Sequence, residues 1–328
     1  MALAQLPTAS VTMVRNDLVI ELPAIDLPAG MAGMEEPMVR TPLAAAVVPA
    51  SGSLSGFRVD VVDSAGRVLP KALLHHVNLS DPGRRELFLP IGLHIFAASK
   101  ETPAATVPWL LFGLPIRKGQ RFITSAMLAN PTSVAYRGVR VRLVLRLTPA
   151  HRPWPLFPAY PWVMDVLFPL GQQPGGSKAF PLPPGRTSRS WVSSPALPGT
   201  ILGMGGHIHD YGVSVEFADS TTGEVIWRGI PERDSTGEVR SLSPARFYRW
   251  NRLGVHITPE HRYRITVTYD NPTGRVIPDG GMGAVAGLFI PDRGTTWPAV
   301  DPADPAYSQD LHDTLFPPMQ MMEMPGMD

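Results

Sequence analysis

Hydrophobic and polar residues alternate over short stretches of this chain, and proline or glycine interrupts the alternation at intervals of about 8–12 residues. Because the side chains of a strand point alternately to the two faces of a sheet, this pattern predicts many short strands and few helices. The strongest strand predictions are residues 57–62, 71–79, 121–128, 138–147, 212–217, 225–229, 263–269 and 284–290. Strands in this number, without helices between them, predict an all-β protein made of two antiparallel, jelly-roll-like β-sandwiches.

Proline and glycine mark the expected domain boundaries. The chain contains 37 Pro and 30 Gly among its 328 residues. Proline is dense over residues 149–185, and because proline lacks the amide donor of a sheet ladder, this stretch is expected to be a connection without strands. The predicted division is therefore a first sandwich at 11–148, the connection, a second sandwich at 186–292, and a Pro- and Met-rich tail at 293–328.

Charge and composition narrow the possible functions. Lys and Arg total 29 against 28 Asp and Glu, and a net charge of +1 predicts no nucleic-acid partner. The absence of cysteine excludes disulfides, zinc ribbons, iron–sulfur clusters and thiol catalysis. No apolar run reaches the length of about 18 residues that a membrane span requires. The triplet Ala2-Leu3-Ala4 has the small-x-small form of a signal-peptide cleavage site, which predicts a secreted or periplasmic protein.

A His-x-His pair, His207 and His209, is the first candidate for chemistry. On a strand both imidazoles point to one face, where they can bind one metal ion. Three of the four residues before the pair are glycine, which permits a close backbone approach and favours a metal site over two surface histidines. Met282 lies between two glycines and has little local packing to do, and a thioether together with imidazoles suits copper, particularly Cu(I).

The adjacent pair His75 and His76 is a weaker candidate. Neighbours on a regular strand point to opposite faces, so both can bind one ion only at a bulge or a strand end. Of the other histidines, His94 is expected to be a core or edge residue, whereas His256 and His261 flank a turn and are expected to be structural.

The order of these groups, with His-His in the first half and then His-x-His and Met in the second, resembles the copper type II, ascorbate-dependent monooxygenases. This is the family of peptidylglycine α-hydroxylating monooxygenase and dopamine β-monooxygenase. The resemblance covers residues 59–290 and implies that His75 and His76 bind a first copper. It also implies that His207, His209 and Met282 bind a second copper.

The resemblance further implies one copper in each sandwich, with the two facing each other across a solvent-filled cleft. At the second site dioxygen would be bound and a C–H bond of a small-molecule substrate hydroxylated. The first site would store an electron drawn from ascorbate or another reductant. Tyr211 and Met204, beside the His-x-His pair, would line the substrate pocket or pack in the core, and the core is favoured for Met204.

The sequence departs from the family pattern at three positions. Met127 stands where the family has the third histidine of the first copper site; a Met ligand favours Cu(I), and a core methionine is the alternative. The peptide-amidating members hold a substrate carboxylate with an Arg before the His-x-His and a Tyr after the Met. Gly205 and Ala286 occupy these positions, so a glycine-extended peptide is not the expected substrate. The family's disulfides are also absent.

A non-enzymatic protein that captures, stores or delivers copper to a partner protein outside the cytoplasm is the alternative function. The altered ligand, the missing substrate residues and two Met-rich stretches, one beginning at Met31 and one over residues 319–327, favour it. The second stretch is expected to be either an inert, disordered end or a thioether hook for Cu(I). A cupin-type site is a weaker alternative because the nearest glutamate, Glu216, lies seven residues beyond His209.

Overall fold

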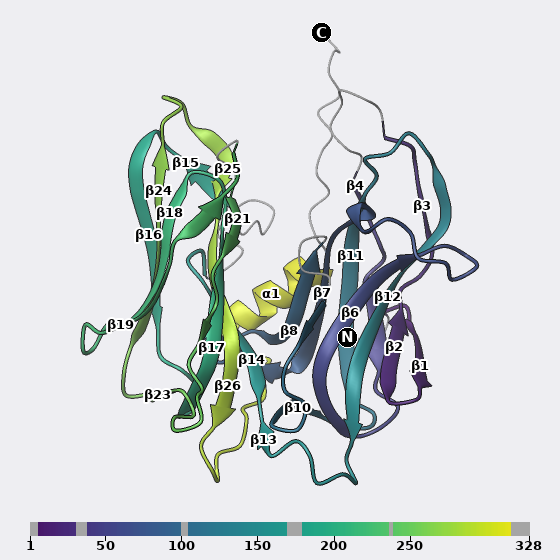
Figure 1. The fold of residues 1–328 in the computed structure, drawn as a ribbon, viewed down its shortest axis with the longest axis horizontal. Coiled ribbons are helices and arrows are strands. Elements are labelled where there is room, and N and C mark those ends of the chain that lie inside the picture. Colours follow the sequence, from purple (N-terminus) through teal and green to yellow (C-terminus); the bar gives the residue numbers. More distant parts are fainter. Residues whose placement is uncertain (1–5, 31–37, 100–103, 169–178, 236–238, 316–328) are drawn as a thin grey trace.

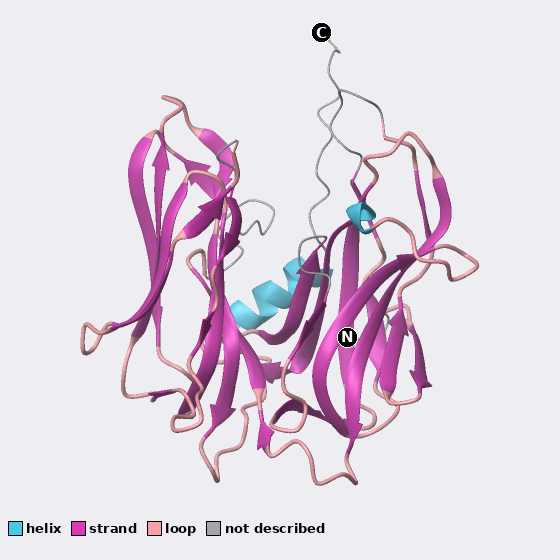
Figure 2. Ribbon diagram, viewed as in Figure 1, coloured by secondary structure: helices cyan, strands magenta, loops and turns pink. Residues whose placement is uncertain are grey.

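The structure, a computed structural model, describes residues 6–30, 38–99, 104–168, 179–235 and 239–315. About 58% of the chain lies in strands and 4% in helices, which confirms the prediction of an all-β protein. Two β-sandwiches lie side by side, and an α-helix runs between them (Figures 1 and 2). Among the described residues, no helix is both long and apolar enough to cross a membrane. The proposed cleavage triplet, Met31 and residues 319–327 lie outside the described residues.

The first sandwich packs an eight-stranded sheet against a five-stranded sheet. The larger sheet contains, in spatial order, β1 (Ser10–Val14), β2 (Asp17–Glu21), β12 (Tyr136–Pro149), β6 (Gly52–Val62), β10 (Phe112–Ile116) and β13 (Phe157–Pro158), with β3 (Ile25–Leu27) beside β12 and β9 (Ala104–Thr106) beside β6. The smaller sheet contains β4 (Met38–Arg40), β11 (Arg121–Ala129), β7 (Leu74–Arg85) and β8 (Gly92–Ser99), with β5 (Ala44–Val47) beside β11. Alternate residues of β12, such as Val139, Val141 and Leu143, are fully buried in the core between the sheets.

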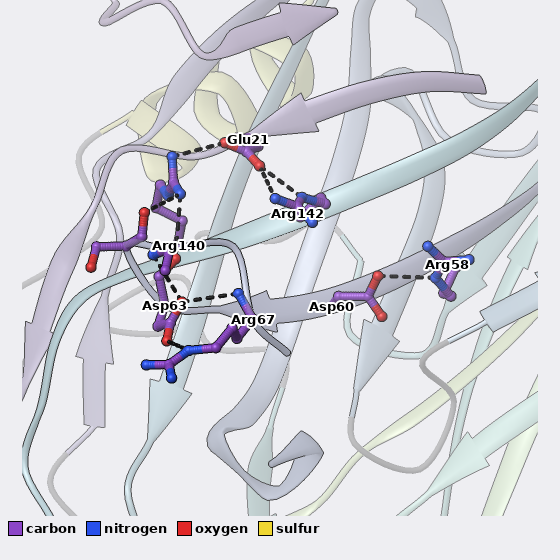
Figure 3. A network of polar contacts seen from close by, with 9 residues as sticks. Glu21, Arg58, Asp60, Asp63, Arg67, Arg140 and Arg142 are labelled. Carbon is purple, nitrogen blue, oxygen red and sulfur yellow. Dashed lines mark hydrogen bonds and ion pairs between the residues drawn. The ribbon is translucent and has the colours of Figure 1, made fainter. Parts of the chain in front are cut away.

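The solvent face of the larger sheet carries cross-strand ion pairs (Figure 3). Glu21 on β2 accepts hydrogen bonds from Arg140 at 3.1 Å and from Arg142 at 2.7 Å, both on β12. Asp63 accepts a hydrogen bond from Arg67 at 2.7 Å in the turn after β6. The charges of these arginines are therefore balanced by the side chains of Glu21 and Asp63.

The second sandwich packs a five-stranded sheet against a four-stranded sheet. One sheet contains β14 (Tyr160–Asp165), β26 (Gly283–Pro291), β17 (Gly199–Ile208) and β22 (Ala245–Arg246), with β23 (Val255–Ile257) beside β17. The other contains β16 (Gly185–Ser193), β24 (Tyr263–Asn271), β18 (Gly212–Asp219) and β19 (Val225–Gly229). Two short pairs complete it, β15 (Phe180–Leu182) with β25 (Ile277–Gly281) and β20 (Pro231–Arg233) with β21 (Val239–Leu242). Its core is aromatic, with Trp162, Phe217 and Tyr263 almost fully buried.

All eight predicted strands lie within observed strands, except that Lys71–Leu73 forms a 3₁₀ turn, η2, immediately before β7. The prediction that residues 149–185 contain no strand is wrong, because β14 pairs with β26 over six residues. β14 is an edge strand, and the Val163 amide points away from β26 to Glu86 at 3.2 Å. Pro161, two residues earlier, shares this outward direction, so its missing N–H removes no ladder hydrogen bond.

Residues 293–315 are also more than a tail. Trp297 stacks on Tyr160 with ring centroids 4.1 Å apart, and its indole N–H donates to the Arg85 carbonyl at 2.8 Å. Helix α1 (Pro305–Leu315) follows, and the Tyr307 hydroxyl donates to the Pro82 carbonyl at 3.1 Å. This segment therefore packs against both sandwiches.

The loop between β7 and β8 joins the two sandwiches. Leu87 and Phe88, although they belong to the first half of the chain, are buried in the core of the second sandwich. The fully buried Glu86 accepts the backbone N–H of His94 on β8 at 2.7 Å and that of Val163 on β14 at 3.2 Å. One buried carboxylate thus accepts backbone hydrogen bonds from a strand of each sandwich.

Candidate metal centres

A β-bulge at the start of β7 brings His75 and His76 to the same face. His76 is paired with Met127 of β11, whereas the next pair joins Leu74 to Leu128, so His75 is an inserted residue without a partner. The insertion lets Leu74 point into the core while both histidines remain at least partly exposed. Their ring centroids lie 5.2 Å apart. The β-bulge that two adjacent histidines need in order to bind one ion is therefore present here.

Met127 lies directly opposite His76 in the antiparallel pair, which places the two side chains on one face of the sheet. It is half-buried, whereas Ala126 and Leu128 on either side of it are buried in the core. The structure therefore brings together His75, His76 and Met127, the three residues predicted for the first site.

The electrostatic environment of the first site is positive. Arg40 of β4 is paired with Met127 from the other side. Burial, the neighbouring His75 and the charge of Arg40 together lower the pKa of His76 to about 4. The His76 imidazole is consequently neutral at physiological pH, which is the form that binds a metal.

The second pair lies at the end of β17. The buried Ile208 separates the exposed His207 from the half-buried His209, as strand alternation requires for two histidines on one face. Their ring centroids are 5.2 Å apart and the rings are nearly perpendicular, at 88°. Met282 precedes β26, and Ile208 is paired with Gly283. His209 and Met282 therefore each lie one residue beyond this pair, at the same end of two neighbouring antiparallel strands.

The hydroxyl of Tyr269 fixes this second site. It accepts the backbone N–H of His209 at 3.1 Å and that of Met282 at 2.8 Å, and it donates to the Met282 carbonyl. Tyr269 is 1% exposed, and burial raises the pKa of its hydroxyl, so that it remains protonated. One buried group thus holds the backbone of both predicted ligands.

The loops around His209 are tightly constrained. Tyr211 and Asp279 adopt positive φ values of 65° and 50°, which are uncommon for residues other than glycine. Burial lowers the pKa of His209, although hydrogen bonds to the Asp279 and Gly280 backbone act in the opposite direction. The neutral imidazole is again favoured.

The glycines beside Met282 are explained by packing. A Cβ on Gly281 would lie 2.2 Å from the Phe180 ring, and one on Gly283 would lie 2.2 Å from the Val267 side chain. Glycine at these two positions therefore lets the turn between β25 and β26 pack closely against Phe180 and Val267. Met282 itself stays half-buried and outside the core cluster.

Gly205 and Ala286, the positions at which the sequence departs from the peptide-amidating enzymes, are direct partners on β17 and β26. Gly205 lies two residues before His207 on β17, so both residues are on the same face of the sheet. Of the neighbouring residues, Met204 is 3% exposed and belongs to the core, and Tyr211 packs against that core. Neither Gly205 nor Ala286 therefore offers a charged or hydroxyl side chain beside the second site.

Three of the five other histidines lie beside a carboxylate. His261 pairs with Asp219 at 2.6 Å, and His256 pairs with Asp292 at 3.0 Å. His94 lies on the edge strand β8, with its ring 3.4 Å from Glu86. Within the described part of the chain, no group of three or more His, Cys, Asp or Glu is placed to hold a metal, so both candidate sites depend on their methionines. Glu216 lies on β18, in the opposite sheet from β17.

The sequence does not indicate the role of Tyr269, which orders the second site, or of Glu86, which joins the two sandwiches. Tyr269 was predicted only as a strand residue, and Glu86 was not predicted to be important at all. The position of Tyr269 at the end of a predicted strand, before an Asp-Asn-Pro turn, was the available signal. No such signal exists for Glu86, whose role depends on packing between the two sandwiches.

No protein-family model matches the sequence, and no curated protein matches it. Among solved structures, it is similar to PNGase F, a glycosylasparaginase from Flavobacterium meningosepticum, with 11% identity and a TM-score of 0.39 over 87% of this chain and 98% of that chain. It is also similar to the major capsid protein P2 from bacteriophage PM2, with 10% identity and a TM-score of 0.36 over 85% of this chain and 100% of that chain.

Proposed function

We propose that this chain is a two-site copper protein of the dicopper monooxygenase type. The observation that supports the proposal is the repeated pairing of two imidazoles with one thioether on neighbouring strands. Met127 lies opposite His76, and Met282 shares the Tyr269 hydroxyl with His209. Imidazole with thioether is a soft ligand set that suits copper, particularly Cu(I), better than it suits zinc or magnesium.

In this proposal His207, His209 and Met282 would hold the copper that supplies C–H hydroxylation chemistry, and His75, His76 and Met127 would hold the copper that supplies electron storage. Copper supplies one-electron chemistry with dioxygen when it is bound, with ascorbate or a similar reductant as the electron source. The protein holds the ligands: Tyr269 orients the backbone of His209 and Met282, and burial keeps the His209 imidazole neutral.

The substrate in this proposal carries no carboxylate that must be recognised beside the second site. Gly205 and Ala286 offer no cationic or hydroxyl group there, and a Cβ on Gly205 would meet only Pro244, at 3.6 Å. The absence of a cationic or hydroxyl side chain at these two positions favours a small molecule without a carboxylate.

Copper storage or delivery to a partner protein is the second candidate function. The pairing of Met127 with His76 favours it, because replacing the family's third histidine by a thioether favours Cu(I) over Cu(II). Under either function we propose an extracytoplasmic location, as the Ala2-Leu3-Ala4 triplet suggests.

Copper reconstitution followed by metal analysis tests both functions. We expect two copper ions per chain and, for the oxygenase, oxygen consumption with ascorbate that exceeds the rate of free copper. Two bound ions without oxygen consumption would favour the storage protein. Fewer than one ion per chain would contradict both functions.

A further inference from the structure

Three loops at one end of the molecule expose large hydrophobic residues. Trp250 is 97% exposed, Leu156 is 55% exposed, and Trp109 is 41% exposed. The set of exposed apolar residues on these loops is Trp109, Leu110, Leu111, Trp154, Leu156, Trp250 and Leu253. Exposed tryptophan and leucine in this number mark an interaction site.

Backbone contacts join the three loops into one surface. The Leu156 amide donates to the Leu110 carbonyl at 3.1 Å, so the loops that precede β10 and β13 are adjacent. The ring of Tyr248 lies 5.3 Å from that of Phe112, which brings the third loop to the same place. Trp250 lies at the tip of that loop, where Arg249 and Arg252 exchange backbone hydrogen bonds.

The segments that form this surface are basic and contain no acidic residues. Residues 102–164 contain no Asp or Glu, and neither do residues 239–259, although the whole chain is nearly neutral. The exposed cations near the apolar set are Arg117, Lys118, Arg152, Arg246, Arg249 and Arg252. Lys118 and Ala150 both donate backbone hydrogen bonds to Ser51, at 2.9 Å and 3.3 Å, which places the first three of these cations together. Arg140 and Arg142 pair with Glu21, whereas none of these six cations forms an ion pair with a described carboxylate.

We infer that this surface, called here the Trp–Arg surface and made of these seven apolar and six cationic residues, docks on an anionic lipid bilayer. Tryptophan places its apolar ring and polar N–H at the level of lipid headgroups, and unpaired arginines and lysines are attracted to anionic lipid. The apolar residues lie on separate loop tips, a shape suited to partial insertion rather than to a flat protein interface. The leucines offer nothing for nucleic-acid bases to stack on, which favours lipid over a polynucleotide.

Docking in this orientation leaves the metal centres accessible. β10, β13 and the loop from β12 to β13 lie at the lower end of the view in Figure 1, whereas β25, which precedes Met282, lies at the upper end. The turn η2, which precedes His75, is also at the upper end and is the short cyan element of Figure 2. Both candidate copper sites would therefore face away from the bilayer.

Co-sedimentation of the full, metal-free chain with vesicles tests the inference independently of copper. We expect binding to phosphatidylcholine vesicles that contain about a third phosphatidylglycerol, little binding to phosphatidylcholine alone, and weaker binding as salt is raised. Trp250→Ala should lower the affinity about tenfold, because the ring no longer leaves water. Since each cation contributes about fivefold at low salt, Arg117→Gln/Lys118→Gln/Arg152→Gln should lower it on the order of a hundredfold.

Val134→Ala/Arg137→Gln is the matched control, since it makes the same kinds of change on exposed residues at the other end of β12. It should bind like the unmodified chain, and all variants should have unchanged circular dichroism. The inference is overturned if anionic vesicles are not bound, or if the Trp250 and triple variants bind as well as the control. It is also overturned if neutral vesicles bind equally, or if the Trp–Arg surface instead forms a dimer in analytical ultracentrifugation that Trp250→Ala abolishes.

Discussion

The two candidate metal centres share a ligand set but are held by different devices. Each combines two imidazoles, with ring centroids 5.2 Å apart, and one methionine from a neighbouring strand. The second site obtains its geometry from ordinary strand alternation and a buried Tyr269 hydroxyl that binds the backbone of both His209 and Met282. The first site obtains it from a single inserted residue, His75.

The second site is the more preorganised of the two. A buried hydroxyl with three backbone contacts restrains two ligands before any metal arrives, so that less ordering is lost on binding. The bulge orients His75 and His76, but the neighbouring Arg40 opposes a cation at that place. We therefore expect the second site to retain copper at lower metal concentrations than the first.

Removing a ligand of the second site should give the largest effect. We predict that His209→Ala lowers bound copper from two equivalents to about one, because two remaining ligands bind weakly. Atomic absorption after reconstitution and desalting measures this. His256→Ala, which removes a histidine paired with Asp292 in the same sandwich, is the control and should keep both ions. Unchanged copper in His209→Ala would show that this histidine is not a ligand.

Removing only the hydroxyl of Tyr269 tests whether preorganisation distinguishes the sites. Tyr269→Phe keeps the buried ring but leaves the N–H groups of His209 and Met282 without their acceptor. We expect a loss of about 2–4 kcal/mol in the free energy of unfolding and an approximately tenfold weaker second site. Copper titration and urea unfolding measure the two quantities.

The first site is the internal control in this experiment. Its affinity should be unchanged in Tyr269→Phe, since Tyr269 belongs to the second sandwich. Equal weakening of both sites would mean that the substitution acts through global stability, and the proposed difference between the sites would then fail.

The sequence predicted the residue types of both sites better than it predicted their surroundings. The sequence alone predicts that His207 and His209 share a face, because side chains two residues apart point to the same side of any extended strand. The bulge at His75 depends on the register between β7 and β11, which no local pattern specifies. The contacts of Tyr269 and Glu86 join segments far apart in the chain, so that only the folded structure brings them together.

The fold shows the same division between local and distant causes. Alternating patterns locate eight strands, whereas the proline density of residues 149–185 gives no indication of β14. The edge position of β14, which makes Pro161 harmless, is a property of the sheet rather than of the segment. Net charge likewise does not describe local charge, since a total of +1 includes the acid-free residues 102–164.

Restoring the family's third histidine at position 127 should strengthen the first site. We predict that Met127→His strengthens Cu(II) binding there several-fold, because imidazole is a better ligand for Cu(II) than a thioether. Electron paramagnetic resonance during Cu(II) titration, in a His209→Ala background, isolates this site. Val39→His, on the neighbouring strand β4, is the control for a histidine that does not face His76. An unchanged spectrum in a folded Met127→His protein would indicate that Met127 only packs.

The smallest expected effect is a difference in acid sensitivity between the metal-free sites. Burial, His75 and Arg40 lower the pKa of His76 to about 4, whereas for His209 the effect of burial is opposed by hydrogen bonds to the Asp279 and Gly280 backbone. A histidine with a lowered pKa binds its proton more tightly in the unfolded chain, so stability is complete above about pH 6.5 and falls as the pH drops from there towards 4. We therefore predict that His76→Gln flattens the decrease in melting temperature between pH 6.5 and 4 by a few degrees, and that His209→Gln flattens it less. Differential scanning calorimetry of the metal-free variants measures how the melting temperature depends on pH. If His209→Gln flattened this dependence more than His76→Gln does, His209 would be the more strongly perturbed histidine.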